Sequence, residues 1–369
     1  MNKKVLAVAV SSALAAPMAA QAVKYKLSGQ INRAAVYQDD GQGTDVQFID
    51  NTSSGTRWRL TGSEDIGSGM KVGFNFEWQA SSNSGHRSIK SADQSPESQA
   101  IRRAEVWFSG NWGKLSLGQG DGAGNGTTEV DLTSTWNAGA YSGRSDFLGS
   151  TAWRTSSGAS VAGFTHGSTF SAYDAFSRYD RVRYDSPALG PVTLSVSAGQ
   201  RDKYEGAARW SQGLGGGQIS AGLYYGTAAN QLPAGATATT AVAGVERYGG
   251  SIAYLFSFGT SLQFSYAEQD RDSAGMEDGK TWYVKVGHNW GNNSVSLGYG
   301  EAEDAFAPLT LAGTAPGHKD KGFNIGYNYN IPKAKVDLYA SFHQNELDAS
   351  GVSVDDLYAV VVGTKLRFD

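Results

Sequence analysis

The stretch RWRLTGSEDIGSGMKVGFNFEW, residues 57–78, alternates strictly between apolar and polar side chains. Its second half carries four apolar side chains on one side of an extended chain, namely Val72, Phe74, Phe76 and Trp78. A period of two predicts strands with one apolar and one polar face. The glycine-containing run 65–69 between the two halves predicts a tight turn. The segment therefore predicts an antiparallel hairpin with two faces of opposite chemistry, and what lies against each face decides the fold.

The first 22 residues differ in composition from the rest of the chain. They combine a basic start at Lys3 and Lys4, an apolar run and the small-residue ending Ala20-Gln21-Ala22, which is the pattern of a cleaved secretory signal. An N-terminal membrane anchor is the alternative, but the apolar run is shorter than the roughly 20 residues that a spanning helix needs. We therefore expect residues 1–22 to be a signal peptide and residues 23–369 to form the folded domain.

The chain of 369 residues contains no cysteine, and its acidic residues outnumber Lys and Arg by 35 to 31. An exported chain without cysteine has no disulfides, so backbone pairing and burial must stabilise it. The acidic balance argues against nucleic acid as a partner. Beyond residue 22 no apolar segment is long enough to cross a membrane as a helix. A membrane-bound form would therefore cross as strands.

Period-two alternation continues to the end of the chain and predicts sixteen strands. The predicted strands are 24–38, 47–63, 70–80, 100–112, 114–120, 178–186, 192–200, 204–212, 217–226, 246–256, 260–269, 280–290, 294–302, 321–330, 335–345 and 355–368. Short connections alternate with longer polar ones such as 81–99, 227–245 and 303–320. Short turns at one end and long loops at the other are typical of outer-membrane barrels. We therefore expect an all-β fold in which residues 23–369 form a 16-stranded antiparallel transmembrane β-barrel.

The two faces of the predicted strands require different surroundings. The polar face carries many charges, and an unpaired buried charge costs several kcal/mol, so this face must contact water. Aromatic residues of the apolar face gather at the short-turn ends, as at a lipid–water interface; the candidates are Trp112, Tyr184, Trp290, Tyr329 and Phe368. A soluble β-sandwich with a charged outer face is the alternative, but it has no use for aromatic residues at one level. We expect lipid outside and water inside.

Sixteen strands enclose a cylinder too wide for side chains to fill, which predicts an aqueous channel. Residues 121–177 form a connection far beyond ordinary loop length. We expect this third long loop to fold inward and to place Glu129 and Asp131 opposite basic residues of the wall. The expected basic wall consists of Arg57, Arg59, Arg103, Arg181 and Arg183. Opposite charges across a narrow pore would filter ions, whereas an ordinary external loop with solvated acids is the alternative.

Several segments of the chain resemble the Gram-negative general porins. They are residues 56–71, the run FSGNWGKLSLGQGD at 108–121, the run RVRYDSP at 181–187 and the last strand, YAVVVGTKLRF. The resemblance implies a homotrimeric channel in the outer membrane of a Gram-negative bacterium, through which small hydrophilic solutes and ions diffuse passively. It also implies contact with outer-membrane lipid and lipopolysaccharide, and assembly by the barrel-assembly machinery.

The chain matches that family at some positions of the expected wall and departs from it at others. Arg57 matches a basic residue at the family's constriction, and the two loop acids lie where its loop acids lie. Glu105 and Gln119 stand where arginine is common in the family, and Gln30 stands where some members have lysine. The basic wall is therefore expected to be thinner here.

A substrate-specific channel for sugars or anions is the main alternative, but only two aromatic residues, Trp107 and Tyr339, point inward by parity. A barrel enzyme is the second alternative. The five histidines are scattered without metal spacing, and Ser341 beside His343 lacks an identifiable third group for a triad. Residues 270–275 begin like a calcium loop but lack its later oxygen ligands. We expect no catalytic activity, no cofactor and no metal site.

Overall fold

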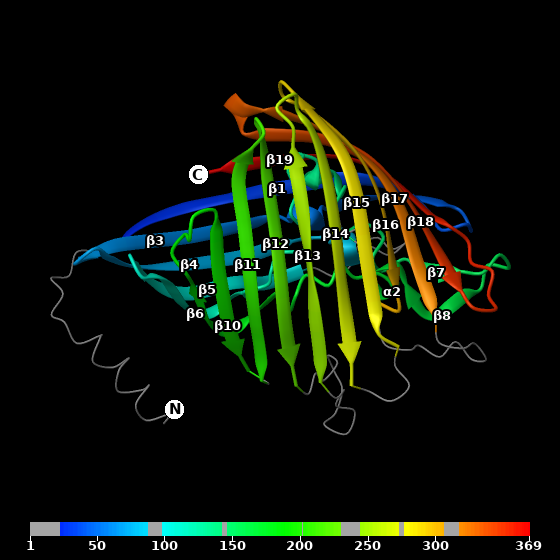
Figure 1. The fold of residues 1–369 in the computed structure, drawn as a ribbon. Coiled ribbons are helices and arrows are strands. Elements are labelled where there is room, and N and C mark those ends of the chain that lie inside the picture. The colour runs from blue at the N-terminus through cyan, green and yellow to red at the C-terminus, as the bar shows by residue number, and fades with distance from the viewer. Residues whose placement is uncertain are drawn as a thin grey trace.

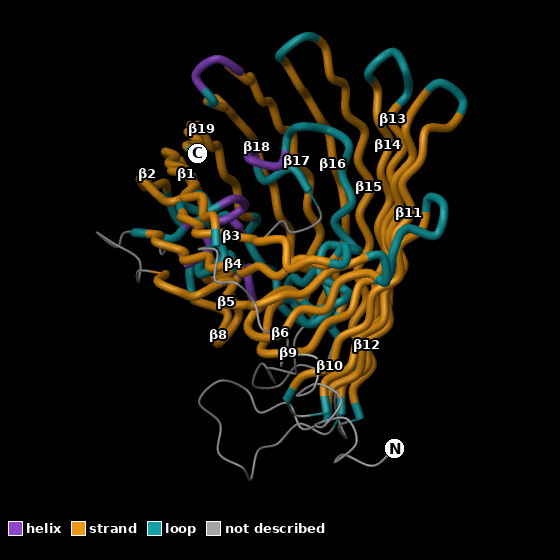
Figure 2. The backbone as a smooth tube through the Cα atoms, turned by 90° about the vertical axis from the view of Figure 1, so that its left-hand side faces the viewer, coloured by secondary structure: helices purple, strands orange, loops and turns teal. Residues whose placement is uncertain are grey.

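The structure is a computed structural model in which residues 23–87, 98–141, 146–200, 202–229, 244–272, 277–305 and 317–369 are described. These residues form a closed antiparallel β-barrel of sixteen strands, as predicted (Figures 1 and 2). The signal peptide predicted at residues 1–22 lies outside them. Within the described ranges, no helix is long and apolar enough to cross a membrane.

The barrel closes where the first strand meets the last. β1 pairs with β19 from Gly29 opposite Phe368 to Asp39 opposite Tyr358. The elements of the wall are β1 (Lys24–Asp39), β2 (Thr44–Asp50), β3 (Arg57–Gly67), β4 (Met70–Ser81), β5 (Ser98–Gly110), β6 (Gly113–Asp121), β9 (Arg178–Asp185), β10 (Val192–Gly199), β11 (Lys203–Leu214), β12 (Gly217–Ala228), β13 (Val245–Leu255), β14 (Thr260–Arg271), β15 (Gly279–Trp290), β16 (Asn293–Glu303), β17 (His318–Ile331), β18 (Val336–Ala349) and β19 (Leu357–Phe368). Because β1 pairs along one half with β2 and along the other with β3, these two elements together make one barrel strand.

The second barrel strand is interrupted, whereas the sequence predicted a continuous strand over 47–63. Between β2 and β3 the chain forms the short helical turn η1 (Thr52–Ser54). Side chains stabilise this break locally, since Asn51 accepts a hydrogen bond from the Ser53 amide and Asp50 accepts one from the Thr56 amide, at 3.0 and 2.9 Å. Asn and Asp compete with ladder pairing in this way because their short side chains reach nearby amides. The break turns the backbone of η1 toward the lumen.

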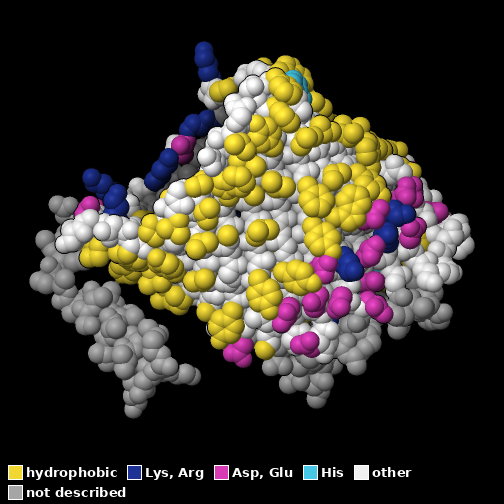
Figure 3. Space-filling view, viewed as in Figure 1, with side chains coloured by type: hydrophobic (Ala, Val, Ile, Leu, Met, Phe, Trp, Pro, Cys, Tyr) yellow, Lys and Arg dark blue, Asp and Glu magenta, His cyan; other side chains and the backbone are white. Residues whose placement is uncertain are grey.

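The two faces of the wall have the chemistry that the alternation predicted. On β6 the outward Leu117 is 62% exposed, while its neighbour Ser116, which points inward, is 2% exposed. Figure 3 shows apolar side chains covering much of the visible outer surface of the strands. Acidic side chains gather toward the long-loop end, and Lys and Arg side chains lie both there and at the opposite edge. An exposed apolar surface of this extent marks a lipid or protein contact.

The predicted aromatic residues lie near the short turns. Trp112 stacks on Tyr184 with ring centroids 6.4 Å apart. Trp290 and Tyr329 both pair with Asn293 at the start of β16. Phe368 covers Gly29, where a Cβ atom would overlap the phenyl ring. Their position at a lipid–water boundary remains a prediction.

The largest apolar cluster lies inside the barrel and not between two layers of secondary structure. It joins residues of β1, β2, β18 and β19, such as Ile49 and Val361, to Phe147, Leu148 and Trp153 of the long connection after β6. That connection contains a hairpin that the sequence did not predict, β7 (Ala152–Arg154) and β8 (Ser160–Thr165), followed by α2 (His166–Thr169). The connection is therefore folded and packed against the wall.

Candidate functional site: the lumen

The lumen segment, defined as residues 122–141 and 146–177, docks on small side chains of the inner face. The Val130 amide donates to Ser251 Oγ at 2.9 Å, and the hydroxyls of Thr135 and Ser296 lie 2.7 Å apart. Three inward glycines allow this close approach, namely Gly222, Gly287 and Gly326, because a Cβ atom at each would crowd the lumen segment. The segment therefore lies along the inner face from β10 to β19 and reaches the break between β2 and β3, and β3 to β9 supply most of the opposite side of the lumen.

A buried ion pair anchors the middle of the lumen segment. Lys285 of β15 donates to Asp131 Oδ2 at 2.8 Å and to the carbonyl of Ala140 at 2.6 Å. The side chains of Lys285 and Asp131 are 0% and 5% exposed. Asp131 is thus neutralised by a lysine of the wall on which the segment docks, whereas the sequence suggested that it would oppose the arginines.

A second anchor holds the turn η3 (Trp136–Ala138) at the break in the wall. Asn51 Nδ2 donates to the Asn137 carbonyl, and Lys365 Nζ donates to Asn137 Oδ1, both at 2.6 Å. On β18, His343 Nε2 lies 3.1 Å from the Ala138 carbonyl and 2.9 Å from Ser341 Oγ. A carbonyl can only accept, so Nε2 carries the proton and donates it. Ser341 and His343, which are neighbours on the inner face, thus help to hold the lumen segment in place.

The side of the lumen opposite the docked wall carries the predicted arginines. Glu77 of β4 is shared by three of them: Arg57 at 3.4 Å, Arg102 at 2.6 Å, and Arg59. The sequence missed Arg102, because it follows Ile101 and precedes Arg103, and adjacent residues of a regular strand face opposite sides. The ladder shifts register between Glu77 and Trp78, and this irregularity turns both arginines inward.

Other cations of this wall are neutralised to different extents. Asp121 is shared by Arg103 and Arg178, which the sequence did not single out. Arg181 forms a closed pair with Glu105, in which the two side chains are 3% and 6% exposed. Arg183 pairs with the neighbouring Asp185 at 2.7 Å. Glu105, which stands where the resembled family commonly has arginine, therefore neutralises Arg181.

Three acidic groups of the lumen segment have raised pKa values. Burial raises the pKa of Glu129, Asp146 and Asp174, and the latter two carboxylates raise that of Glu129 further. For Asp146 burial raises the pKa to about 6. Arg178 acts on Glu129 and Arg102 acts on Asp146 in the opposite direction, so both acids lie within the field of the arginine wall. Asp146 was not singled out from the sequence, where nothing distinguishes it from other loop acids.

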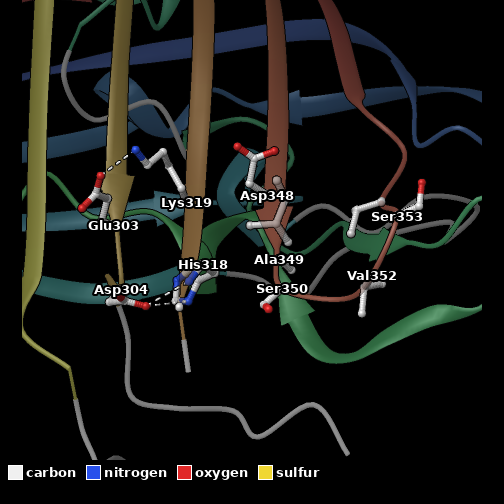
Figure 4. A pocket seen from close by; sticks show the side chains of 12 residues that line it. Glu303, Asp304, His318, Lys319, Asp348, Ala349, Ser350, Val352 and Ser353 are labelled. Carbon is white, nitrogen blue, oxygen red and sulfur yellow. Dashed lines mark hydrogen bonds and ion pairs between the residues drawn. The ribbon is translucent and has the colours of Figure 1, made fainter. Parts of the chain in front are cut away.

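A cleft at the long-loop end contains charged side chains that pair with one another. The cleft has a volume of about 590 Å³ and lies between the ends of β16, β17 and β18; Figure 4 shows the side chains that line it. In it Lys319 lies 2.7 Å from Glu303, and His318 Nδ1 lies 3.4 Å from Asp304. Across the described ranges, no group of three or more His, Asp and Glu side chains is placed to hold a metal ion.

Comparison with known proteins identifies the chain. The family model described as Gram-negative porin matches residues 6–350. The chain belongs to the Gram-negative porin family. No curated protein matches the sequence. Together with the closed barrel, the membership makes the protein an outer-membrane channel for passive diffusion of small hydrophilic solutes.

Solved structures share the fold at low sequence identity. The anion-selective porin from Comamonas acidovorans is 19% identical over 94% of this chain and 100% of its own, with a TM-score of 0.61. The channel DcaP of Acinetobacter baumannii is 16% identical over 96% and 100%, with a TM-score of 0.60. Salmonella typhi OmpF in complex with daunomycin is 13% identical over 94% and 98%, with a TM-score of 0.59. At these identities the likeness shows the barrel architecture alone.

The anchor between Lys285 and Asp131 predicts a stability test. Lys285→Met leaves the Asp131 carboxylate buried without its cation, which costs about 3–5 kcal/mol at such sites. We expect faster proteolysis within the lumen segment and a lower unfolding temperature in detergent. Adding Asp131→Asn should recover most of the loss, because no buried charge then remains. If Lys285→Met matched the wild type in both measurements, the pair would not anchor the segment.

The raised pKa of Asp146 predicts a pH-dependent selectivity. Below about pH 6 the Asp146 carboxyl is protonated, the lumen loses a negative charge, and anions should pass more readily than at pH 7.5. The reversal potential under a potassium chloride gradient, measured at pH 5 and at pH 7.5, reports this shift. Asp146→Asn should reduce the difference between the two values. An Asp146→Asn channel with the full wild-type pH response would show that another group titrates.

Proposed function

We propose that this channel prefers anions to cations. The observation that carries the proposal is that arginines outnumber carboxylates on one wall. Glu77 forms ion pairs with three arginines, and Asp121 forms ion pairs with two. A one-to-one ion pair, such as that of Arg181 with Glu105, adds no net charge. The five shared arginines therefore leave three positive charges without a wall carboxylate. Among the five arginines, Arg59 and Arg103 have the side chains that are 38% exposed.

The acids of the lumen segment offset this charge only in part. Asp131 is already paired with Lys285. The pKa values of Glu129, Asp146 and Asp174 are raised, so these carboxyls hold protons at higher pH than ordinary ones. A fixed positive excess beside a water-filled path raises the local concentration of anions. The anion-selective porin from Comamonas acidovorans has the same architecture, which is consistent with this proposal.

A channel specific for sugars is less well supported by the geometry. Such a channel would need aromatic rings exposed along the path. Tyr339 is 2% exposed, and its hydroxyl donates to Asn32 on β1 at 2.7 Å. The ring of Trp107 lies beneath the Lys114 ammonium, 5.1 Å away. Both aromatic residues on which the sugar-channel alternative depended therefore contact other side chains of the barrel wall. Passive diffusion without a catalytic step is the function that we propose.

Removing arginines from the shared clusters tests the anion preference. Arg59→Gln and Arg102→Gln should each lower the chloride-to-potassium permeability ratio, by up to about fivefold if the charge acts at 4 Å through water. The effect should shrink at high salt, because ions screen the charge. Lys280→Gln is the matched control, since Lys280 lies on the outer face opposite Glu303 and Glu268. Unchanged reversal potentials in both arginine variants would refute the proposal.

We also propose that the channel is a homotrimer in which the β1 face contacts a second copy. Arg33 points outward from β1, between Ile31 and Ala35, and its side chain is 40% exposed. It donates to the Ser82 carbonyl at 2.9 Å, and its Nη1 lies 3.7 Å from Oδ2 of the buried Asp50. An arginine that faces lipid near the bilayer centre would cost about 2–4 kcal/mol. Contact of Arg33 with a second copy of the protein avoids this cost. OmpT of Vibrio cholerae, of similar fold, is described as a trimer form.

Arg33→Leu separates protein cover from lipid at this face. If a second copy covers Arg33, the substitution removes polar contacts, and the trimer should dissociate at a lower temperature on semi-native gels. Because Arg33 also lies 3.7 Å from the buried Asp50, the comparison is made in an Asp50→Asn background. If lipid covers Arg33, its replacement there removes an unfavourable charge, and the assembly should be as stable as the Asp50→Asn parent or more so. The second result would place the interface elsewhere.

A further inference from the structure

A small polar pocket extends from the arginine wall toward the short turn between β5 and β6. Its volume is about 170 Å³ and its lining includes Arg103, Lys114, Arg183 and Asn75. Arg103, Arg181 and Asp121 line it together with Lys114, so the pocket is continuous with the arginine wall.

The carboxylates of this pocket already accept hydrogen bonds from protein donors. Glu105 accepts from Asn75 Nδ2 at 2.6 Å and from Arg181. Asp185 accepts from Arg183 at 2.7 Å and from Ser195 Oγ at 2.6 Å. Carboxylates with such partners are stabilised in their charged form and repel an incoming anion less than free ones would. They hold the pocket in shape and offset the arginines.

Lys114 is different, because no ion pair to it is found among the residues that the structure describes. Its ammonium lies 5.1 Å from the centre of the Trp107 ring, a distance typical of a cation–π contact. Trp107 is in turn held flat against Gly73, the residue directly opposite it on β4, where any Cβ atom would overlap the indole. The ring therefore positions the ammonium without neutralising it, and the three N–H donors of Lys114 remain for a ligand.

We propose that Lys114 and the adjacent guanidinium of Arg103 form a transient binding site for small oxyanions, of which sulfate is the simplest divalent example. This inference rests on the proposed anion preference and adds to it a position and a ligand class. The donors line one polar pocket, and the charge that its carboxylates leave uncompensated is that of Lys114. A conducting channel needs binding sites weak enough to release the ion, and a half-exposed lysine in contact with water meets that condition.

The test measures chloride current through single channels in planar bilayers while sodium sulfate is added on either side. The wild-type channel should show saturable inhibition by sulfate. Lys114→Gln should raise the half-inhibiting concentration by about tenfold or more, the change expected when a hydrogen bond to a charged group is lost. Lys24→Gln is the control, because Lys24 also lies near the short turns but outside the pocket. It should leave the half-inhibiting concentration unchanged.

A second variant distinguishes the site from a general charge effect. Trp107→Leu keeps the lysine but removes the ring that positions it, and should weaken inhibition by sulfate without moving the reversal potential in potassium chloride. Inhibition that does not saturate, or equal effects of Lys114→Gln and Lys24→Gln, would overturn the inference while leaving the anion preference intact. A wild-type channel that prefers cations in potassium chloride would overturn the proposed function, and this inference with it.

Discussion

Closure of the sheet by β1 against β19 is the constraint on which the rest of the structure depends. In lipid every backbone N–H and C=O must be paired within the protein, so a sheet can cross a membrane only without free edges. Once the wall is closed, one face of every strand contacts lipid and the other faces the lumen. The charged side chains of the polar face therefore lie in the lumen. The lumen is therefore charged because the exterior cannot be.

The inner face is divided into two halves of different chemistry, and that division creates the path. On β12 to β18, serines and glycines accept the lumen segment, and the pair Lys285–Asp131 holds its middle. On β3 to β9, arginines share too few carboxylates. If the segment lay on the arginine side, its acids would neutralise that wall. Because the segment is anchored opposite, water and an excess of positive charge are left between them.

The strands, their number and the chemistry of their faces were predictable from the sequence, because alternation with a period of two is local. The five arginines expected from parity carry their ion pairs on the inner face of the wall, and their role at a constriction stays a prediction. Arg102 could not be found in this way, since the register shift opposite Glu77 is set by pairing between β4 and β5. The partner of Asp131 was equally hidden, because Lys285 lies 154 residues away and meets it only through the docked segment. The break at 51–56 also depends on long-range contacts, such as that between Asn51 and Asn137.

The central claim is that the shared arginines give the lumen a positive excess. The most direct measurement is the zero-current potential of the wild-type channel at pH 7, in a planar bilayer separating two concentrations of potassium chloride. The account predicts the sign for chloride crossing faster than potassium, with a magnitude that falls as both salt concentrations are raised together. A potential of the opposite sign would contradict it, because the acids of the lumen segment, and not the arginines, would then control the path.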